Sequence, residues 1–357
     1  MKVRASRISS SIARAIVRQS HHSGGLAGRL FSIILNFFAL FRLALTRYRP
    51  DEFQALRQEV WQLDEEEYEA SFRASKTRRR AKVRDTELVP IGDLGYSGST
   101  FFTTTNSKYL IKSLPRRFEY DFFIRELREA YFAHMRAHPT SLLVRITDMV
   151  FTPHASLGGM LGAAPTHHIV MENLLYGKGL GNEGDEWETY DLKPSDYFFP
   201  ERDIADGRLV SESVRERLID TFPGKVRVSA DMKRDLISLL EADTQLLADK
   251  SAVDYSLFLV RFPSVNNRER QPSHVPFIYS VSHPWRTGVD DVDRNWTYRA
   301  VVLDFFWGKS TLRARAMTGL VNAYNVMADR GPMSITADPG EYRERFLSMV
   351  DDIVEEA

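Results

Sequence analysis

The 357-residue chain contains no cysteine, and this absence removes several classes of chemistry at once. Without a thiol there is no disulfide framework, no thiolate zinc site and no cysteine nucleophile. The chain also lacks an apolar run of the roughly 20 residues that a membrane-spanning helix needs. This composition fits a reducing, cytoplasmic setting best.

Acidic residues are missing from the first 50 positions, although the whole chain carries 48 basic and 48 acidic side chains. This basic, serine-rich arm, residues 1–50, contains the short apolar stretch Leu30–Phe41. Three interpretations of the arm stay open. It is an interfacial helix on anionic lipid, a mitochondrial presequence, or a helix docked on the folded domain or a loose tail.

A helical extension and a basic linker, residues 51–85, follow the arm. Apolar residues at spacings of three and four within Asp51–Ala74 predict an amphipathic helix. The basic run Lys76–Arg84 lacks the aromatic or groove-entering context of nucleic-acid readers. We therefore expect a solvated linker and no nucleic-acid partner.

The hydrophobic period changes to that of strands after residue 86. The runs Phe101–Thr105 and Tyr109–Leu114 are separated by Asn106 and Ser107, which predicts a hairpin. Further strands are expected at Leu142–Phe151, His168–Leu174, Tyr190–Lys193, Asp254–Phe262 and Ala300–Phe306, and helices at Phe118–His138, Ala230–Lys250 and from Glu341. This order predicts an α+β chain, with an antiparallel sheet and one helix in residues 86–175 and a larger mixed α/β region in residues 176–357.

A glycine-rich turn precedes the predicted hairpin and is the first candidate for binding chemistry. In Gly95, Ser97, Gly98 and Ser99, small side chains let backbone N–H groups approach phosphate oxygens. Such clusters are also ordinary hairpin turns. The turn is not a Walker A loop or a Rossmann fingerprint, because it lacks Gly-Lys-Ser/Thr and no helix follows it.

Lys112 is the second candidate, because it lies inside an apolar strand, where an unpaired ammonium group is costly to bury. In kinases such a lysine contacts the ATP phosphates and is held by a helix carboxylate. Glu119, Asp121 and Glu126 on the next helix are the available partners. The alternative is a strand lysine that faces water.

Two aspartates complete the set. Asp254 stands at the entrance of a predicted strand, and Asp304 follows the apolar run Ala300–Leu303. A carboxylate at the end of a buried strand is costly unless a cation such as Mg²⁺ offsets its charge. Each aspartate alone could cap an element, but the order and spacing of all four features indicate a kinase.

The stretch from Ile91 to Val350 resembles the phosphatidylinositol phosphate kinase family, and in particular the phosphatidylinositol-4-phosphate 5-kinases. The similar segments are GYSGSTF at residues 95–101, YLIKSL at 109–114, HIVMENLL at 168–175, YDLKPS at 190–195, AVDYSLF at 252–258, VVLDF at 301–305 and MSITADPGEYRERF at 333–346. The resemblance implies a two-lobed kinase-like fold that transfers phosphate from ATP, with Mg²⁺, to a phosphatidylinositol phosphate in anionic membranes. Family members often pair, so a homodimer is one expectation.

The resemblance also implies roles for individual residues. Asp254 would act as the catalytic aspartate, Lys193 would stabilise the transferring phosphoryl group, and Asp304 would hold Mg²⁺. The nucleotide would be bound by Gly95, Ser97, Gly98, Ser99, Lys112 and Glu119, with Met171, Asn173 and Leu174 around adenine. Lys309, Arg313 and Arg315 would recognise the lipid head group, although a solvated cationic segment is the alternative.

One departure from the family pattern bears on activity. Pro194 replaces the glycine of the Asp-Leu-Lys-Gly-Ser motif, and proline removes an N–H donor beside Lys193. A weakly active or inactive, pseudokinase-like scaffold that binds phosphoinositide is therefore the second hypothesis. A protein kinase is disfavoured, because the chain has no His-Arg-Asp catalytic loop and Asp304 is not followed by Phe-Gly.

Overall fold

The computed structural model describes residues 2–17, 43–73, 88–92, 100–155, 157–160, 164–178, 187–194, 221–264, 281–309 and 334–357. The chain divides into two compact units. Unit 1 comprises Met1–Leu94, Gly98–Pro115 and Arg145–Tyr176, and unit 2 comprises Gly95–Ser97, Arg116–Val144 and Gly177–Ala357. The predicted lobe bounds at residues 175 and 176 stay a prediction.

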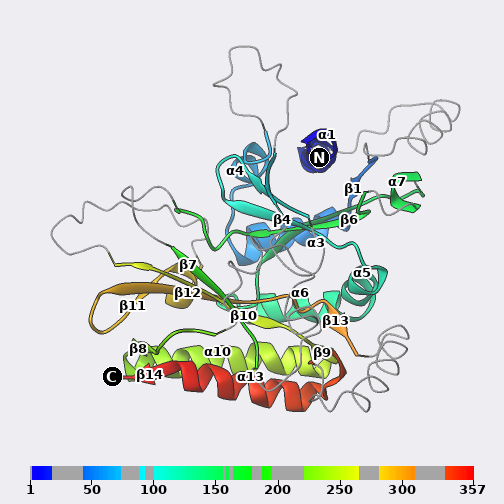
Figure 1. Cartoon of the computed structure of the whole chain (residues 1–357). Helices are drawn as coiled ribbons and strands as arrows, with labels where there is room; N and C mark the ends of the chain where they lie inside the picture. Colours follow the sequence, from blue (N-terminus) through cyan, green and yellow to red (C-terminus); the bar gives the residue numbers. More distant parts are fainter. Residues whose placement is uncertain are drawn as a thin grey trace, which may run out of the picture. The chain divides into compact units, whose positions relative to one another are not determined.

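Unit 1 is built on a six-stranded antiparallel sheet (Figure 1). In order across the sheet, the strands are β1 (Thr46–Arg47), β5 (Ile146–Phe151), β6 (His167–Glu172), β4 (Tyr109–Ser113), β3 (Phe101–Thr104) and β2 (Leu88–Gly92). Pro90 lies on the edge strand β2, where a missing N–H is tolerated. The short helix α7 (Leu157–Met160) belongs to the same unit.

The hairpin predicted from residues 101–114 is confirmed as the pair β3 and β4. In its turn, the Asn106 side-chain oxygen accepts hydrogen bonds from the Thr104 hydroxyl at 2.7 Å and the Lys108 N–H at 3.2 Å. Ser107 adopts a left-handed conformation with φ 58°. Short polar side chains at these positions stabilise the tight turn through local hydrogen bonds.

The extension after the arm differs from its prediction, because one expected helix is interrupted. It consists of α3 (Pro50–Ala55), a π-helical segment (Leu56–Val60) and, after a break, α4 (Glu65–Ala70). Gln62 takes a left-handed φ of 54°, and the Asp64 carboxylate accepts from the Glu67 N–H at 2.7 Å, which starts a new helix. The helical spacing of apolar residues continues across this break, so the sequence alone predicts one helix.

The N-terminal arm contains a helix that the sequence did not single out, α1 (Lys2–Val17). Ile8, Ile12 and Ile16 are buried, and α1 packs on β1, β2 and β5 of unit 1. Of the three interpretations of the arm, the docked helix therefore holds for residues 2–17, while Leu30–Phe41 lies outside the described residues. No described helix is both long and apolar enough to cross a bilayer.

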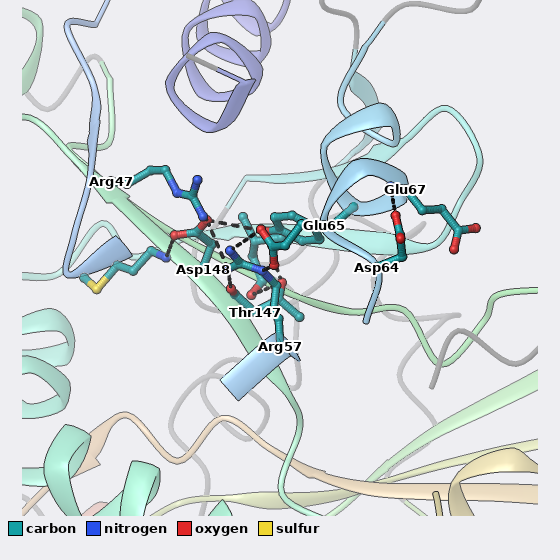
Figure 2. A network of polar contacts seen from close by, with 10 residues as sticks. Arg47, Arg57, Asp64, Glu65, Glu67, Thr147 and Asp148 are labelled. Carbon is teal, nitrogen blue, oxygen red and sulfur yellow. Dashed lines mark hydrogen bonds and ion pairs between the residues drawn. The ribbon is translucent and has the colours of Figure 1, made fainter. Parts of the chain in front are cut away.

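A buried charge network ties the extension to β5 within unit 1 (Figure 2). Arg57 is fully buried, and its guanidinium donates to Glu65 at 2.6 and 2.9 Å and to the Thr147 carbonyl at 2.6 Å. Asp148, also fully buried, lies 2.8 Å from Arg47 and 3.6 Å from Arg57. Residues 47–65 are therefore an integral part of unit 1.

Unit 2 contains a four-stranded antiparallel sheet and a layer of helices (Figure 1). The sheet order is β11 (Val289–Asp290), β12 (Trp296–Leu303), β10 (Ser256–Pro263) and β7 (Glu188–Leu192), and the two-stranded sheets are β13 (Trp307–Gly308) with β9 (Ala252–Val253), and β14 (Val354–Glu356) with β8 (Val226–Val228). The helices are α5 (Arg117–Phe122), a π-helical segment (Phe123–Leu127), α6 (Arg128–Ala137), α10 (Ala230–Asp249), α11 (Pro284–Thr287) and α13 (Pro339–Ile353). The α+β class predicted from the sequence is thus observed.

The long helix α10 forms for reasons visible in the sequence. Leu236, Leu240 and Leu247 fall on one face and are buried, and the Ser229 hydroxyl accepts from the Met232 N–H at the helix start. α10 and α13 lie side by side (Figure 1). The helix thereby carries Asp243 into the interior of unit 2.

Asp243 organises a buried polar network that supports the sheet. Its carboxylate accepts from the Ser141 hydroxyl and the Leu142 N–H, both at 2.7 Å, and lies 2.6 Å from His134 Nε2. The loop held in this way pairs with β12, where the Val302 N–H donates to the Leu142 carbonyl at 2.7 Å. The end of β12, which leads into Asp304, is therefore fixed from inside unit 2.

Candidate active site

Three of the predicted catalytic side chains meet at one edge of the four-stranded sheet. Leu192, at the end of β7, pairs with Leu257 of β10, and Ser256, at the start of β10, pairs with Leu303 at the end of β12. Because neighbouring strands are antiparallel, the end of β7, the start of β10 and the end of β12 share this edge. Lys193, Asp254 and Asp304 stand directly beyond these strand ends.

Lys193 and Asp254 form an ion pair at this edge. Lys193 Nζ lies 3.1 Å from Asp254 Oδ1, and the two side chains are 21% and 22% exposed. Burial by itself would lower the pKa of Lys193, but the carboxylates of Asp254, Asp191 and Asp304 raise it above its ordinary value. The ammonium group therefore stays charged at neutral pH.

Three carboxylates, those of Asp254, Asp191 and Asp304, act on the ammonium group of Lys193. Carboxylates gathered in this way suit a divalent cation. Mg²⁺ in particular is held by one or two carboxylates together with the phosphates of a nucleotide. Among the residues that the structure describes, no cluster of three or more ligating side chains could hold a metal by itself. The residues present thus fit an ion that arrives with phosphate ligands.

The backbone at both aspartates is unusual. Asp254 has a φ of 64° and Asp304 a φ of 61°, so both lie in the left-handed region. Aspartate tolerates this region better than most residues, yet each such position costs on the order of 1–3 kcal/mol. Observed strain of this kind clusters at functional sites. Outside the four-stranded sheet, the segment just before Asp254 and the segment just after Asp304 pair again, as β9 and β13.

Two residues of this site were missed by the sequence reasoning. Asp191 lies two positions before Lys193 on β7, so strand alternation points both to one face, and this spacing could have found it. Ser334 donates a hydrogen bond to Asp254 at 2.7 Å from 80 residues away. No local pattern signals such a distant contact.

Lys112 is placed in the middle of the sheet of unit 1. β4 is flanked by β3 and β6, and Lys112 pairs with Phe101 and Ile169 across them. The residue is only 5% exposed, and its ammonium lies 5.7 Å from the Phe101 ring centre. It is therefore not a strand lysine that faces water. Its contact with ATP stays a prediction.

Glu119, one of the three carboxylates predicted to be available to Lys112, has a local role at the start of α5. Its Oε2 accepts from the Arg116 N–H at 3.2 Å, which satisfies a donor at the helix N-terminus. The guanidinium of Arg116 lies 3.9 Å from its other oxygen. The contact of Glu119 with the nucleotide stays a prediction.

The predicted adenine-binding segment follows β6. Met171 lies within β6 and pairs with Leu110, and both Met171 and Leu174 are buried. The Asn173 side chain donates to the Ser107 carbonyl at 2.7 Å and accepts from the Leu175 N–H at 3.1 Å. This amide therefore holds the segment against the β3–β4 turn. The adenine contacts stay predictions.

The remaining predicted residues are placed only in part. Gly95, Ser97, Gly98, Ser99, Arg313 and Arg315 lie outside the described residues. Lys309 is described, is half-buried, and donates its backbone N–H to the Ser251 carbonyl at 2.9 Å. It directly follows β13, five positions after Asp304 in the sequence.

Comparison with known proteins gives the family. Residues 83–283 match the family described as Phosphatidylinositol-4-phosphate 5-Kinase. A Dictyostelium discoideum protein, named a probable phosphatidylinositol phosphate kinase, is 26% identical over 230 residues, which cover 63% of this chain and 29% of that protein. A Plasmodium falciparum protein, named phosphatidylinositol 4-phosphate 5-kinase, is 25% identical over 282 residues, which cover 72% of this chain and 15% of that protein.

This chain thus spans less than a third of the length of either relative. The family match nevertheless covers more than half of this chain and includes Lys112, Lys193 and Asp254. The resemblance seen in the sequence is confirmed, and the chain belongs to the phosphatidylinositol-4-phosphate 5-kinase family.

Proposed function

We propose that the chain is a lipid kinase that transfers the γ-phosphate of ATP to the inositol ring of a phosphatidylinositol phosphate. One observation carries this proposal: Lys193, Asp254 and Asp304 lie together at one edge of the sheet of unit 2. Phosphoryl transfer depends mainly on positioning and on electrostatic stabilisation of the moving charge. An ammonium group held among three carboxylates provides both.

The roles follow from the charges. The oxygen of the ring hydroxyl forms a bond to the γ-phosphorus, and Asp254 accepts the proton of that hydroxyl. The bond from that phosphorus to the bridging oxygen breaks, and ADP leaves with the electron pair. Lys193, 3.1 Å from Asp254, stabilises negative charge on the phosphoryl group during transfer. Asp304 would hold Mg²⁺, which supplies charge neutralisation on the phosphates.

The preferred acceptor is proposed to be phosphatidylinositol 4-phosphate, phosphorylated at the 5-position. The description of the matching family and the name of the Plasmodium relative support this choice. Lys309, at the end of the described segment after Asp304, is a cation suited to an anionic head group. Arg313 and Arg315 follow it in the sequence and are suited to bidentate phosphate contacts.

A full-length chain assayed with ATP and Mg²⁺ tests the proposal. The substrates are neutral vesicles that each contain one of the monophosphorylated phosphoinositides, and the product isomers are resolved. We expect the 4-phosphate to give the 4,5-bisphosphate. Another product isomer would reject the proposed specificity, and a protein substrate phosphorylated at a comparable rate would favour a protein kinase.

A second candidate function rests on Pro194, which is buried and follows Lys193 directly. Its missing N–H and fixed φ are compatible with a scaffold that binds phosphoinositide without transferring phosphate. Pro194→Gly, which restores the family residue, separates the two functions. A large gain in turnover over an almost inactive parent would support the scaffold, whereas a parent that is already active would reject it.

Peripheral attachment to anionic membranes is also proposed. The apolar face of α1 is buried in unit 1, whereas Arg4 and Arg7 are exposed on the other side. A cation near an anionic leaflet contributes about 1 kcal/mol. Arg4→Glu with Arg7→Glu should weaken vesicle binding at least severalfold at low salt, and the exposed Arg73→Glu is the control. Unchanged binding in the double variant would remove α1 from the membrane contact.

A further inference from the structure

The carboxylate of Asp254 is held through one of its two oxygens. The Ser334 hydroxyl donates to Oδ1 at 2.7 Å, and Lys193 Nζ lies 3.1 Å from the same oxygen. Within the described part of the chain, these are the hydrogen bond and ion pair of this side chain, and both end on Oδ1. Among the described residues, Oδ2 is thereby left for another partner.

Ser334 is itself rigidly placed. It is fully buried and begins a 3₁₀ turn, Ser334–Thr336, just before α13. Its neighbours Ile335 and Ala337 are only 5% exposed. The Asp338 carboxylate accepts from the Gly340 and Glu341 N–H groups at 2.9 and 3.3 Å and so fixes the start of α13. The hydroxyl is therefore in position before any substrate binds.

The same segment also fixes the backbone next to Asp254. The Tyr342 hydroxyl donates to the Tyr255 carbonyl at 2.6 Å, and both residues are fully buried. The Tyr255 ring packs against the rings of Tyr342 and Phe346 at 4.8 and 5.0 Å between centres. A left-handed aspartate persists only where its surroundings hold it, and α13 supplies that support.

We propose that Ser334 is a positioning residue for phosphoryl transfer. By occupying Oδ1, it fixes the rotamer of Asp254 so that Oδ2 accepts the proton of the attacking ring hydroxyl. This inference rests on the proposed lipid kinase function and adds a residue to its machinery.

Ser334→Ala tests the proposal in the full chain. We expect kcat to fall roughly tenfold, because the base loses its fixed geometry, with little change in KM for ATP. Ser334→Thr, which keeps the hydroxyl, should restore most of the rate.

Thr244→Val is the matched control, because it removes an equally buried hydroxyl from unit 2. That hydroxyl donates to the Leu240 carbonyl at 2.6 Å and not to Asp254. The control should leave kcat unchanged. If Ser334→Ala does not fold, as judged by circular dichroism, Ser334→Cys replaces the hydroxyl with a weaker donor and should lower kcat in the same direction.

The outcomes separate this inference from the proposed function. An active wild type together with an unchanged kcat in the folded Ser334→Ala variant overturns the positioning role alone. A wild type that phosphorylates no phosphoinositide overturns the proposed function and this role with it. In an Asp254→Asn background, Ser334→Ala should add little further loss of kcat, and a full additional loss would also overturn the inference.

Discussion

Two charged clusters, one in each unit, use similar side chains and differ in balance and burial. In unit 1, Arg47 and Arg57 face Asp148 and Glu65, and both Arg57 and Asp148 are fully buried. In unit 2, Lys193 faces three carboxylates, and the Lys193 and Asp254 side chains are about one-fifth exposed. The first cluster pairs two arginines with two carboxylates in the interior, whereas the second gathers three carboxylates around one lysine that water or a ligand can reach.

This difference has a physical consequence. Buried charges must be paired, because an uncompensated ion in the interior is costly, so a balanced cluster is a structural element. A partly exposed cluster of several carboxylates gains stability when a cation binds to it. The predictions below therefore assign loss of stability to the cluster in unit 1 and loss of activity to the cluster in unit 2.

The largest expected effect is on activity. Asp304→Asn should lower phosphorylation of phosphatidylinositol phosphate by roughly 10³-fold, because the proposed Mg²⁺ site loses its charge. The melting temperature should stay the same or rise, because the change removes one of three neighbouring negative charges. Lipid kinase assays and circular dichroism measure the two quantities. Full activity in a folded variant would reject the metal role of Asp304.

The largest expected effect on stability comes from the other cluster. Asp148→Asn removes the carboxylate shared by Arg47 and Arg57 and should lower the free energy of unfolding by about 3 kcal/mol. Urea denaturation measures this loss. Arg73→Gln breaks an exposed pair with Glu69 and should cost less than about 1 kcal/mol. Equal losses in the two variants would contradict the structural role of the buried network.

A packing defect four positions after Asp304 in the sequence should lower both stability and activity. In Gly308→Ala, the new Cβ would overlap the buried Phe122 ring, which should cost about 1–3 kcal/mol and lower kcat. Phe122→Leu in the same chain should recover part of the loss. Gly340→Ala, whose nearest contact is 3.2 Å, is the milder control. Thermal melts and kinase assays would show whether the two losses occur together.

The effect that is smallest at neutral pH, and grows only as the pH falls, concerns His168 in unit 1. Burial lowers the pKa of His168 to about 3, so the folded chain holds this imidazole neutral while the unfolded chain protonates it near pH 6.5. The unfolded state then binds more protons, and the free energy of unfolding falls between pH 6.5 and 3 by up to about 1.4 kcal/mol per pH unit.

Replacing this histidine tests the assignment. His168→Gln should flatten the fall in stability below pH 6.5, because the variant has no imidazole to protonate there. The exposed His154→Gln should follow the wild-type curve. Urea denaturation at several pH values measures the difference, and an unchanged slope in His168→Gln would show that other groups cause the pH dependence.

Local features of the fold were predictable because their causes are local. The β3–β4 hairpin follows from alternating apolar residues and turn chemistry at Asn106 and Ser107, and α10 follows from leucines at helical spacing. The interruption at Gln62 was not predictable, because the apolar period continues through it. The burial of Arg57 and its network with Asp148 likewise depend on a contact between distant segments.

By itself, the sequence determined the α+β class, the candidate residues Lys193, Asp254 and Asp304, and their likeness to the family. Only the tertiary structure decided that these side chains meet, because strand register, as in Ser256 opposite Leu303, brings the ends of distant strands to one edge. It also decided that Ser334 reaches Asp254 and that α1 docks on unit 1. Periodicity is encoded within a few residues, whereas register and burial emerge from the packing of the whole chain.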